Sequence, residues 1–227
     1  LEVLKERTPQ FDYAAGHSLG EYAALVVTGV ISAEDAIKAV AKRASLMEDA
    51  CQKNPGTMAA ILGLDGPAVE EVCEKASAAG IVVPANFNSQ SQIVISGEMA
   101  AIDKAIELAK SVGAKRAIKL EVGGAFHSPL MEPARMELEK YLRGVTFSSA
   151  THPVIANVTA KPVVKSTEFH TLLVDQVTSP VKWAQSMAFL TDSGVTTIVE
   201  IGPGKILAGL AKRDMQPTES INLDTLA

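Results

Sequence analysis

A serine stands between two glycines near the start of the chain, in the run Gly16-His17-Ser18-Leu19-Gly20. A short apolar run precedes it, and a helix-like apolar run, residues 19–27, follows it. A serine on a sharp turn from a strand into a helix is a nucleophile elbow, and the glycines would let the strand and the helix approach each other. The first N–H groups of that helix would face a developing oxyanion. The pattern predicts a nucleophilic Ser18; the alternative is a glycine-rich turn with a bystander serine.

A serine hydroxyl needs a base within hydrogen-bonding reach, and the chain contains four histidines. His17 adjoins the serine, and neighbours on a turn tend to point apart. His152 and His170 stand in polar segments, where a solvated surface residue is the simpler interpretation. His127 follows two glycines and precedes a helix start at Ser128-Pro129, which would fix its position. We therefore predict that His127 is the base.

No carboxylate completes a triad by its spacing. In α/β-hydrolases the acid lies between the serine and the histidine along the chain. Each aspartate in that interval stands within or at the start of a predicted helix, and the four are Asp35, Asp49, Asp65 and Asp103. A histidine oriented by another kind of group fits better, although a glutamate or a later aspartate stays open.

An arginine follows on the helix that Ser32 is predicted to cap. The helical period places Ile37, Val40, Ala44 and Met47 on the apolar face, with Arg43 at its border. A long cationic side chain at such a border usually extends its charged end into water. From the period alone, Arg43 is expected to be a surface residue.

The segment from 56 to 122 reads strand, helix, strand, strand, helix, strand, which is the ferredoxin-like order. Residues 86–89 are expected to form the loop between its middle strands. We predict an α/β fold with an α/β-hydrolase-like parallel-sheet core of residues 1–54 and 124–227, and an inserted ferredoxin-like α+β subdomain of residues 55–123. The elbow strand comes so early that it has no preceding partner. We therefore expect either that later strands complete the sheet or that the N-terminal part of the core is missing from the sequence.

Composition sets broad limits on function. The 227 residues are 47% hydrophobic, and a net charge of -5 gives no global attraction to nucleic acid or to an anionic membrane. Two cysteines, Cys51 and Cys73, lie on helical patterns and suggest neither a disulfide framework nor a metal site, which fits a reducing cytoplasm. No segment is typical of a signal peptide or a membrane span. The run from Gly202 to Lys205 lacks the spacing of a phosphate-binding loop and is interpreted as a tight turn.

Several short motifs, taken together and in order, resemble the bacterial malonyl-CoA:acyl-carrier-protein transacylases over nearly the whole chain. They are Gly16-His17-Ser18-Leu19-Gly20-Glu21-Tyr22, the helix of Arg43, Asn86-Phe87-Asn88-Ser89, Ala125-Phe126-His127-Ser128, Gln176 with Ser179-Pro180-Val181-Lys182-Trp183, and Glu200-Ile201-Gly202-Pro203-Gly204-Lys205.

The resemblance implies an acyltransferase of fatty acid biosynthesis. Such an enzyme moves a malonyl group from malonyl-CoA to the phosphopantetheine thiol of acyl carrier protein, in a ping-pong reaction through a malonyl-serine ester. It implies a cytoplasmic enzyme with no metal and no bound cofactor, and with neither nucleic acid nor membrane as a partner. A monomer is expected, but the sequence fixes neither the oligomeric state nor the range of acyl groups.

The resemblance also implies roles for individual residues. Ser18 corresponds to the nucleophile and His127 to the base, with main-chain carbonyls at Asn88 and Gln176 orienting the imidazole in place of an acid. The substrate-binding positions are Arg43, Leu19 and His17. Arg43 would hold the malonyl carboxylate through a bidentate contact, and the Leu19 N–H would donate to the oxyanion.

Other implications concern specificity and partners. Ala125-Phe126 resembles the sequence of malonyl-selective members, although packing alone would explain it equally well. Lys115 and Arg116 are candidates for docking the acidic carrier protein, although two solvated charges are an equally simple interpretation. The family begins with a strand and a glutamine-bearing loop that completes the oxyanion hole. Because no such segment precedes Leu1, a longer natural protein is expected.

Two rival functions stay open. A serine hydrolase or thioesterase would share Ser18 and His127 but has no use for an arginine facing the acyl group, so an Arg43→Ala variant separates the two cases. The other rival is a non-catalytic fragment or a module that only docks the carrier protein.

Overall fold

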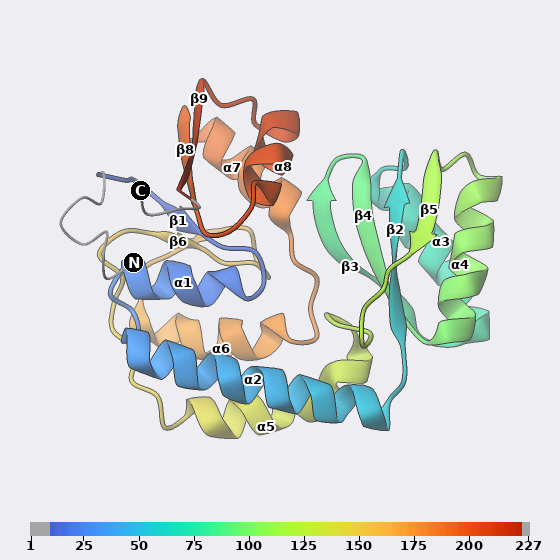
Figure 1. Ribbon diagram of the computed structural model, residues 1–227, viewed down its shortest axis with the longest axis horizontal. Coiled ribbons are helices and arrows are strands. Elements are labelled where there is room, and N and C mark those ends of the chain that lie inside the picture. The colour runs from blue at the N-terminus through green and yellow to red at the C-terminus, as the bar shows by residue number, and fades with distance from the viewer. Residues whose placement is uncertain (1–9, 224–227) are drawn as a thin grey trace.

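The first elements of the chain meet at the serine turn. β1 (Ala14–Ala15) enters the turn, and α1 (Gly20–Val27) leaves it. The computed structural model describes residues 10–223, and Figure 1 shows α1 stacked above a longer helix pair, with a separate sheet to one side. The elbow expected from the sequence is therefore formed, although the strand before it is only two residues long.

α2 (Ala33–Lys53) is capped by Ser32, whose hydroxyl accepts a hydrogen bond from the Asp35 N–H. Its buried face differs from the face expected from the sequence. Ile37 is 71% exposed, whereas the small side chains of Ala36 and Ala39 are buried. This rotation carries Arg43 to the inside of the helix, because close packing of small residues against neighbouring helices decides which face is buried. The prediction of a surface arginine is wrong.

Two further helices complete the layer around α2. α5 (Glu132–Leu142) packs on α2, and α6 (Ser166–Gln176) packs on α5. Buried residues from all three, among them Leu46, Leu138 and Leu173, share one hydrophobic cluster with α1. The C-terminal end of α6 is thereby fixed against the elbow.

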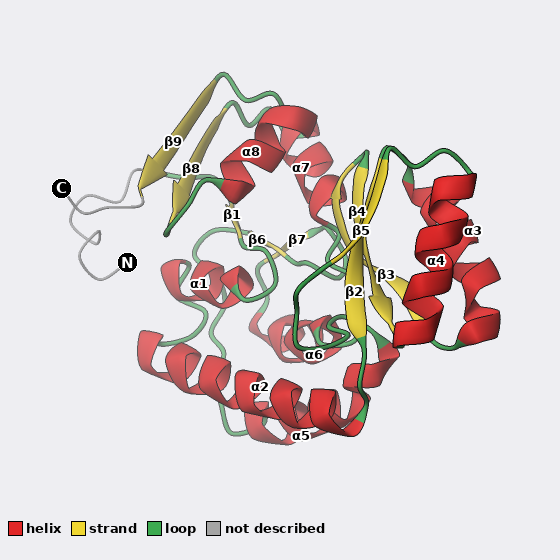
Figure 2. Cartoon of the chain, turned by 45° about the vertical axis from the view of Figure 1, so that its right-hand side comes forward, coloured by secondary structure: helices red, strands yellow, loops and turns green. Residues whose placement is uncertain are grey.

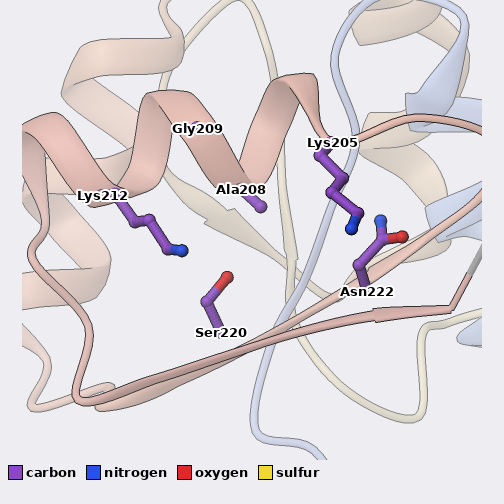
Figure 3. Close-up of a pocket in the computed structure, with 6 residues that line it drawn as sticks. All are labelled: Lys205, Ala208, Gly209, Lys212, Ser220 and Asn222. Carbon is purple, nitrogen blue, oxygen red and sulfur yellow. The ribbon is translucent and has the colours of Figure 1, made fainter.

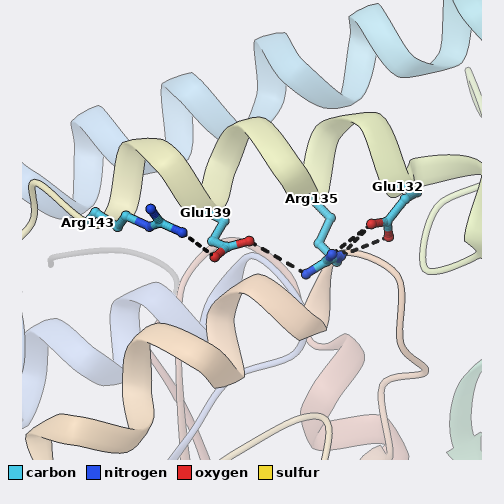
Figure 4. A network of polar contacts seen from close by, with 4 residues as sticks. All are labelled: Glu132, Arg135, Glu139 and Arg143. Atoms are coloured by element: carbon cyan, nitrogen blue, oxygen red, sulfur yellow. Dashed lines mark hydrogen bonds and ion pairs between the residues drawn. The ribbon is translucent and has the colours of Figure 1, made fainter.

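The outer face of α5 carries a row of alternating charges. Glu132, Arg135, Glu139 and Arg143 follow one another along the helix, as Figure 4 shows. Both carboxylate oxygens of Glu132 accept hydrogen bonds from Arg135. Solvent screens ion pairs at this spacing, so packing rather than this row holds α5 in place.

β1 forms a small sheet with two other short strands. β6 (Val154–Ile155) pairs parallel to β1, and β7 (Pro162–Val163) pairs antiparallel to β6. β6 is only two residues long. The chain leaves it so that Asn157 faces the elbow, to which its side chain is hydrogen bonded.

Residues 57–119 contain the expected order of strands and helices. The sheet order is β3-β4-β2-β5, as Figure 1 shows, and every pair is antiparallel. Figure 2 shows the two helices of this segment on one side of the sheet. Both helices cover one face, where they share a cluster with β2 and β4 that is separate from the cluster of α2. The bounds are β2 (Thr57–Leu62), α3 (Gly66–Ala76), β3 (Val82–Ser89), β4 (Gln92–Gly97), α4 (Met99–Ser111) and β5 (Arg116–Lys119).

The loop expected at residues 86–89 is part of β3. This strand pairs with β4 up to Ser89, with register shifts on either side of Asn86-Phe87. It also joins the rest of the molecule, because the Phe87 N–H donates to the Val181 carbonyl at 2.9 Å. Pairing on both sides overrides the polar, loop-like composition of these residues.

The last elements lie above the elbow in Figure 1. α7 (Trp183–Asp192) and α8 (Ile206–Asp214) pack together, and β8 (Thr197–Ile201) pairs parallel to β9 (Glu219–Leu223). Within residues 10–223, no helix has the length and apolar character needed to span a bilayer.

Candidate active site

The elbow holds Ser18 in a backbone conformation that few serines adopt. Its φ is 50°, in the left-handed region that disfavours residues with a Cβ. The turn can close because Gly16 has no side chain, since a Cβ there would lie 2.0 Å from the Gly20 carbonyl oxygen. The expectation for Gly20 was wrong, because a Cβ at that position would meet open space.

Ser18 and His127 meet across the elbow. The serine Oγ lies 2.8 Å from His127 Nε2. His127 is 4% exposed and also has a positive φ of 56°. The turn that follows it is capped by Ser128, whose hydroxyl accepts from the Leu130 N–H and donates to the Ala125 carbonyl. The two residues that sequence analysis selected for nucleophile and base are therefore in contact.

A main-chain carbonyl orients the imidazole. His127 Nδ1 lies 2.8 Å from the carbonyl oxygen of Gln176. Because a carbonyl only accepts hydrogen bonds, Nδ1 must carry the proton, and Nε2 presents its lone pair to Ser18. Burial, together with the positive charge of Arg43, lowers the pKa of His127 to about 4, although the main chain of Gln176 opposes the shift. The ring is neutral at physiological pH and ready to accept a proton.

The second expected carbonyl, that of Asn88, is not a partner of His127 in the described part of the chain. The side chain of Asn88 instead accepts a hydrogen bond from His17 Nε2 at 2.8 Å. The register shift between Phe87 and Ser89 redirects this part of β3, as bulges do. The main chain of Ser179, rather than that of Asn88, also acts on His127 and raises the pKa of its imidazole slightly.

Arg43 reaches the serine from α2. It is 7% exposed, and its Nη2 donates to Ser18 Oγ at 3.0 Å and to Gln176 Oε1 at 3.3 Å. Its Nε is buried and has no hydrogen-bond partner within residues 10–223. A buried guanidinium with an unused donor beside a nucleophile can bind an anionic group.

Two buried polar residues hold the elbow from behind, and sequence analysis assigned a role to neither. Asn157 accepts from the Ser18 N–H at 2.7 Å and donates to the Gly16 carbonyl at 2.7 Å. Glu21, on α1, accepts from the side-chain amide of Gln176. A polar residue that ends an apolar strand, and a glutamate on the buried face of a helix, were the signals that could have identified them.

The pocket in front of Ser18 has a volume of about 390 Å³. The Leu19 N–H borders the serine and has no acceptor within the described residues, so it is free to donate to an oxyanion. His17 lines the same pocket with its ring near Trp183. Its lining residues are His17, Ser18, Arg43, Ala44, Met47, Glu48, Met58, Asn86, Phe126 and His127.

Other candidate residues lie apart from this pocket. Lys115 and Arg116 are exposed at the start of edge strand β5 and line no part of it. His152 contacts Phe11 and His170 contacts Phe147, and neither histidine lines the pocket. Across the part of the chain that the structure describes, no group of three or more metal-binding side chains is present.

The glycine-rich turn after β8 does not form an anion site at the start of α8. The carboxylate of Glu200 already accepts from the N–H groups of Leu207 and Ala208, which are the donors a phosphate would need. A second cavity of about 440 Å³ lies beside this helix, where Lys205 and Lys212 face β9 (Figure 3). The cavity lining contains no serine–histidine pair.

The pKa of His127 generates a test. We expect labelling of Ser18 by a serine-directed sulfonyl fluoride to stay constant through neutral and mildly acidic pH and to reach half its maximum near pH 4, because the neutral imidazole persists down to its pKa of about 4. His127→Ala should slow labelling by roughly a hundredfold or more. His152→Ala is the control and should not change it. A midpoint near 6.5, typical of a solvated histidine, would contradict this account.

Comparison with known proteins assigns the chain to a family. The model of the acyl transferase domain family matches residues 1–226. The malonyl CoA-acyl carrier protein transacylase of Bacillus subtilis is 46% identical over 94% of this chain and 68% of its own length. An acyl carrier protein S-malonyltransferase from Vibrio cholerae is 39% identical, with a TM-score of 0.95 over 99% of this chain and 74% of that one.

A second similar structure contains a partner. It is a malonyl-transacylase in complex with its type II PKS acyl-carrier protein, 40% identical, with a TM-score of 0.93 over 99% of this chain and 73% of that one. The shared fold and the identity over nearly the whole chain lead to one conclusion: the chain belongs to the acyl transferase family and, within it, to the malonyl-CoA:acyl-carrier-protein transacylases.

Proposed function

We propose that this protein transfers a malonyl group from malonyl-CoA to the phosphopantetheine thiol of an acyl carrier protein, as a step of fatty acid biosynthesis. The observation that carries the proposal is the convergence of two groups on one oxygen. His127 Nε2 and Arg43 Nη2 lie 2.8 and 3.0 Å from Ser18 Oγ. A base and a carboxylate-binding cation at one nucleophile fit an acyl group that bears a carboxylate. Relatives named for malonyl transfer, one of them bound to its carrier protein, support the donor and the acceptor.

In the first half-reaction, His127 Nε2 takes the proton of the Ser18 hydroxyl as Oγ attacks the thioester carbonyl. The tetrahedral oxyanion accepts a hydrogen bond from the Leu19 N–H. When the C–S bond breaks, the CoA sulfur takes the proton from His127 and leaves as the thiol. A malonyl ester of Ser18 remains.

The malonyl carboxylate binds Arg43 throughout this step. The guanidinium matches a carboxylate through two parallel hydrogen bonds, which an acetyl group cannot accept. The bound anion also offsets the positive charge that opposes protonation of His127, because Arg43 lowers the pKa of that imidazole. The correct substrate therefore strengthens the base that it needs. His17 lines the same pocket as Ser18, which supports a role for it in binding the acyl-thioester end of the substrate.

In the second half-reaction the phosphopantetheine thiol gives its proton to His127 Nε2 and attacks the serine ester. The C–O bond breaks, and Ser18 Oγ recovers the proton from His127. The product is malonyl-thioester on the carrier protein. Because each step exchanges an acyl group between oxygen and sulfur, the route uses no metal and no redox cofactor.

The main-chain carbonyl of Gln176 keeps His127 in the required tautomer, which is why no acid of a triad is needed. A hydrolase would share Ser18 and His127, yet a buried arginine on the serine oxygen has no place in it. The contacts of Arg43 therefore favour transfer of an acid-bearing acyl group over simple hydrolysis.

We also propose the finer organisation of the fold. Residues 1–54 and 124–227, of which 1–9 and 224–227 lie outside the described residues, are proposed as an α/β-hydrolase-like core, supported by the parallel β1–β6 pair beside the elbow. Residues 55–123 form an inserted ferredoxin-like subdomain, supported by its own hydrophobic cluster. Hydrogen exchange that showed one cooperative unit across both parts would contradict this division.

We further propose that the protein is a monomer in a reducing cytoplasm, with neither nucleic acid nor membrane as a partner. Cys51 and Cys73 are buried free thiols, which supports the compartment. Cell fractionation and light scattering of the purified protein test these two points, and a secreted or dimeric protein would contradict them.

The complete reaction should depend on the Ser18 hydroxyl. Malonyl-CoA and a carrier protein bearing phosphopantetheine should yield malonylated carrier protein, and Ser18→Ala should abolish the product because no ester can form. Ser45→Ala, an exposed serine of α2, is the matched control and should be fully active. Transfer that survives in Ser18→Ala would contradict the ester route.

The choice between malonyl and acetyl groups should depend on Arg43. Arg43→Ala should lower malonyl transfer by roughly a hundredfold or more, because the substrate carboxylate loses its buried partner. Acetyl transfer should be retained or improved, since the cation beside His127 is gone. Lys42→Ala, the exposed neighbour, should change neither rate. An equal loss with both acyl groups would support the hydrolase interpretation instead.

Docking of the carrier protein should depend on two exposed cations. Lys115 and Arg116 are exposed, and neither has an ion-pair partner among the described residues. Reversing both charges with K115E and R116E should raise KM for the acidic carrier protein and leave acylation by malonyl-CoA unchanged. K75E, on α3, is the control. An unchanged KM for the carrier protein would place the docking surface elsewhere.

A further inference from the structure

A buried carboxylate lies directly behind the nucleophile. Glu21 is 3% exposed, one residue into α1, and it lines no part of the pocket in front of Ser18. No lysine, arginine or histidine lies within ion-pair distance of it in residues 10–223. Burial of a carboxylate without a salt bridge is unfavourable, and it raises the pKa of Glu21 to about 7. An apolar residue would pack at this position at lower cost.

The partners of Glu21 indicate what the carboxylate does. Its Oε2 accepts from Gln176 Nε2 at 2.5 Å, and both of its oxygens lie 3.4 Å from the Asn157 N–H. Gln176 Nε2 also donates to the Ser18 carbonyl at 3.1 Å. Both hydrogens of that amide are therefore used, and its oxygen must face the other way.

The oxygen of this amide faces the substrate-binding cation. Gln176 Oε1 accepts from Arg43 Nη2 at 3.3 Å, on the same nitrogen that contacts Ser18 Oγ. An ionised carboxylate can only accept, so Glu21 excludes the flipped amide, which would turn its NH₂ group toward the guanidinium. The orientation of Gln176 is thus specified from behind.

We propose that Glu21 is a positioning residue for substrate selection: by fixing the amide of Gln176, it holds the Arg43 guanidinium in place for the carboxylate of the acyl group. The inference rests on the proposed function, because it concerns how that same site distinguishes acyl groups. Glu21 acts on His127 only weakly, since the imidazole contacts the main chain of Gln176 and not its amide.

The test compares acylation of Ser18 by malonyl-CoA and by acetyl-CoA, followed as the burst of released CoA near pH 8, where Glu21 is ionised. Glu21→Gln keeps the shape but can donate as well as accept, so it lets the Gln176 amide flip. KM for malonyl-CoA should rise about tenfold, the loss expected when a hydrogen bond to a charged group is disordered. The acetyl burst should stay within about twofold, because Asn157 still holds the Ser18 N–H, the Ser18–His127 contact does not involve the amide, and an acetyl group has no carboxylate for Arg43. Thr28→Val, a buried polar residue at the end of the same helix, is the control.

A second variant removes the contact between Gln176 and Arg43 directly. Gln176→Leu retains the main-chain carbonyl for His127 and removes the amide, so it should reproduce the loss of malonyl selectivity even if Glu21→Gln does not fold. In an Arg43→Ala background, Glu21→Gln should have no further effect on selectivity, because the residue through which it acts is absent.

Equal losses with both acyl groups, unchanged selectivity in either variant, or additive losses in the double variant would overturn the positioning role. The wild-type protein separates this failure from failure of the proposed function. If wild type gives no burst with malonyl-CoA, the transferase assignment itself is wrong. If it gives a burst and the variants behave alike with both substrates, only the role of Glu21 is wrong.

Discussion

One buried residue, Gln176, connects every part of the candidate site through its main-chain carbonyl and its side-chain amide. It is fully buried at the last turn of α6, its main-chain carbonyl orients His127, and its amide contacts Ser18, Arg43 and Glu21. The amide and the carbonyl can serve these roles together only if the end of α6 is fixed. Packing of α6 on α5, and of α5 on α2, supplies that constraint, because these helices share one hydrophobic cluster. The positions of the reacting groups thus depend on a helix that contributes no reacting atom.

The charges of the site follow from burial. The imidazole of His127 is kept neutral, Arg43 is a buried cation, and Glu21 is a carboxylate whose pKa lies near neutrality. A neutral carbonyl as the partner of His127 adds no further negative charge, so the site retains its affinity for a substrate carboxylate. An aspartate in the same place would compete with that substrate for Arg43. Within residues 10–223, the lack of a carboxylate on His127 and the presence of a buried arginine are therefore two aspects of one electrostatic arrangement.

Local chemistry made part of the site predictable from the sequence. Ser18 and His127 stand at turns whose glycine, serine and proline residues specify the backbone nearby, and the structure brings the two side chains into contact. The order of strands and helices between 57 and 119 was readable for the same reason, because each element has its own period and its own end signals. The residues that sequence interpretation placed best are those whose conformation is determined within a few positions.

Tertiary contacts determined the positions of the site residues that local sequence signals do not specify. Arg43 was expected in water because the apolar period of α2 does not reveal which neighbouring helix it packs against. Residues 86–89 were expected to be a loop, although pairing with β4 and Val181 makes them strand. Asn88 contacts His17 rather than His127, and Glu21 and Asn157 act across more than a hundred residues of sequence.

The central claim is that Ser18 becomes a malonyl ester, and intact-protein mass spectrometry after brief mixing with malonyl-CoA tests it most directly. The account predicts a mass increase equal to one malonyl group, located on the peptide that contains Ser18 and absent from Ser18→Ala. A folded protein that consumes malonyl-CoA without ever carrying the malonyl group would contradict it.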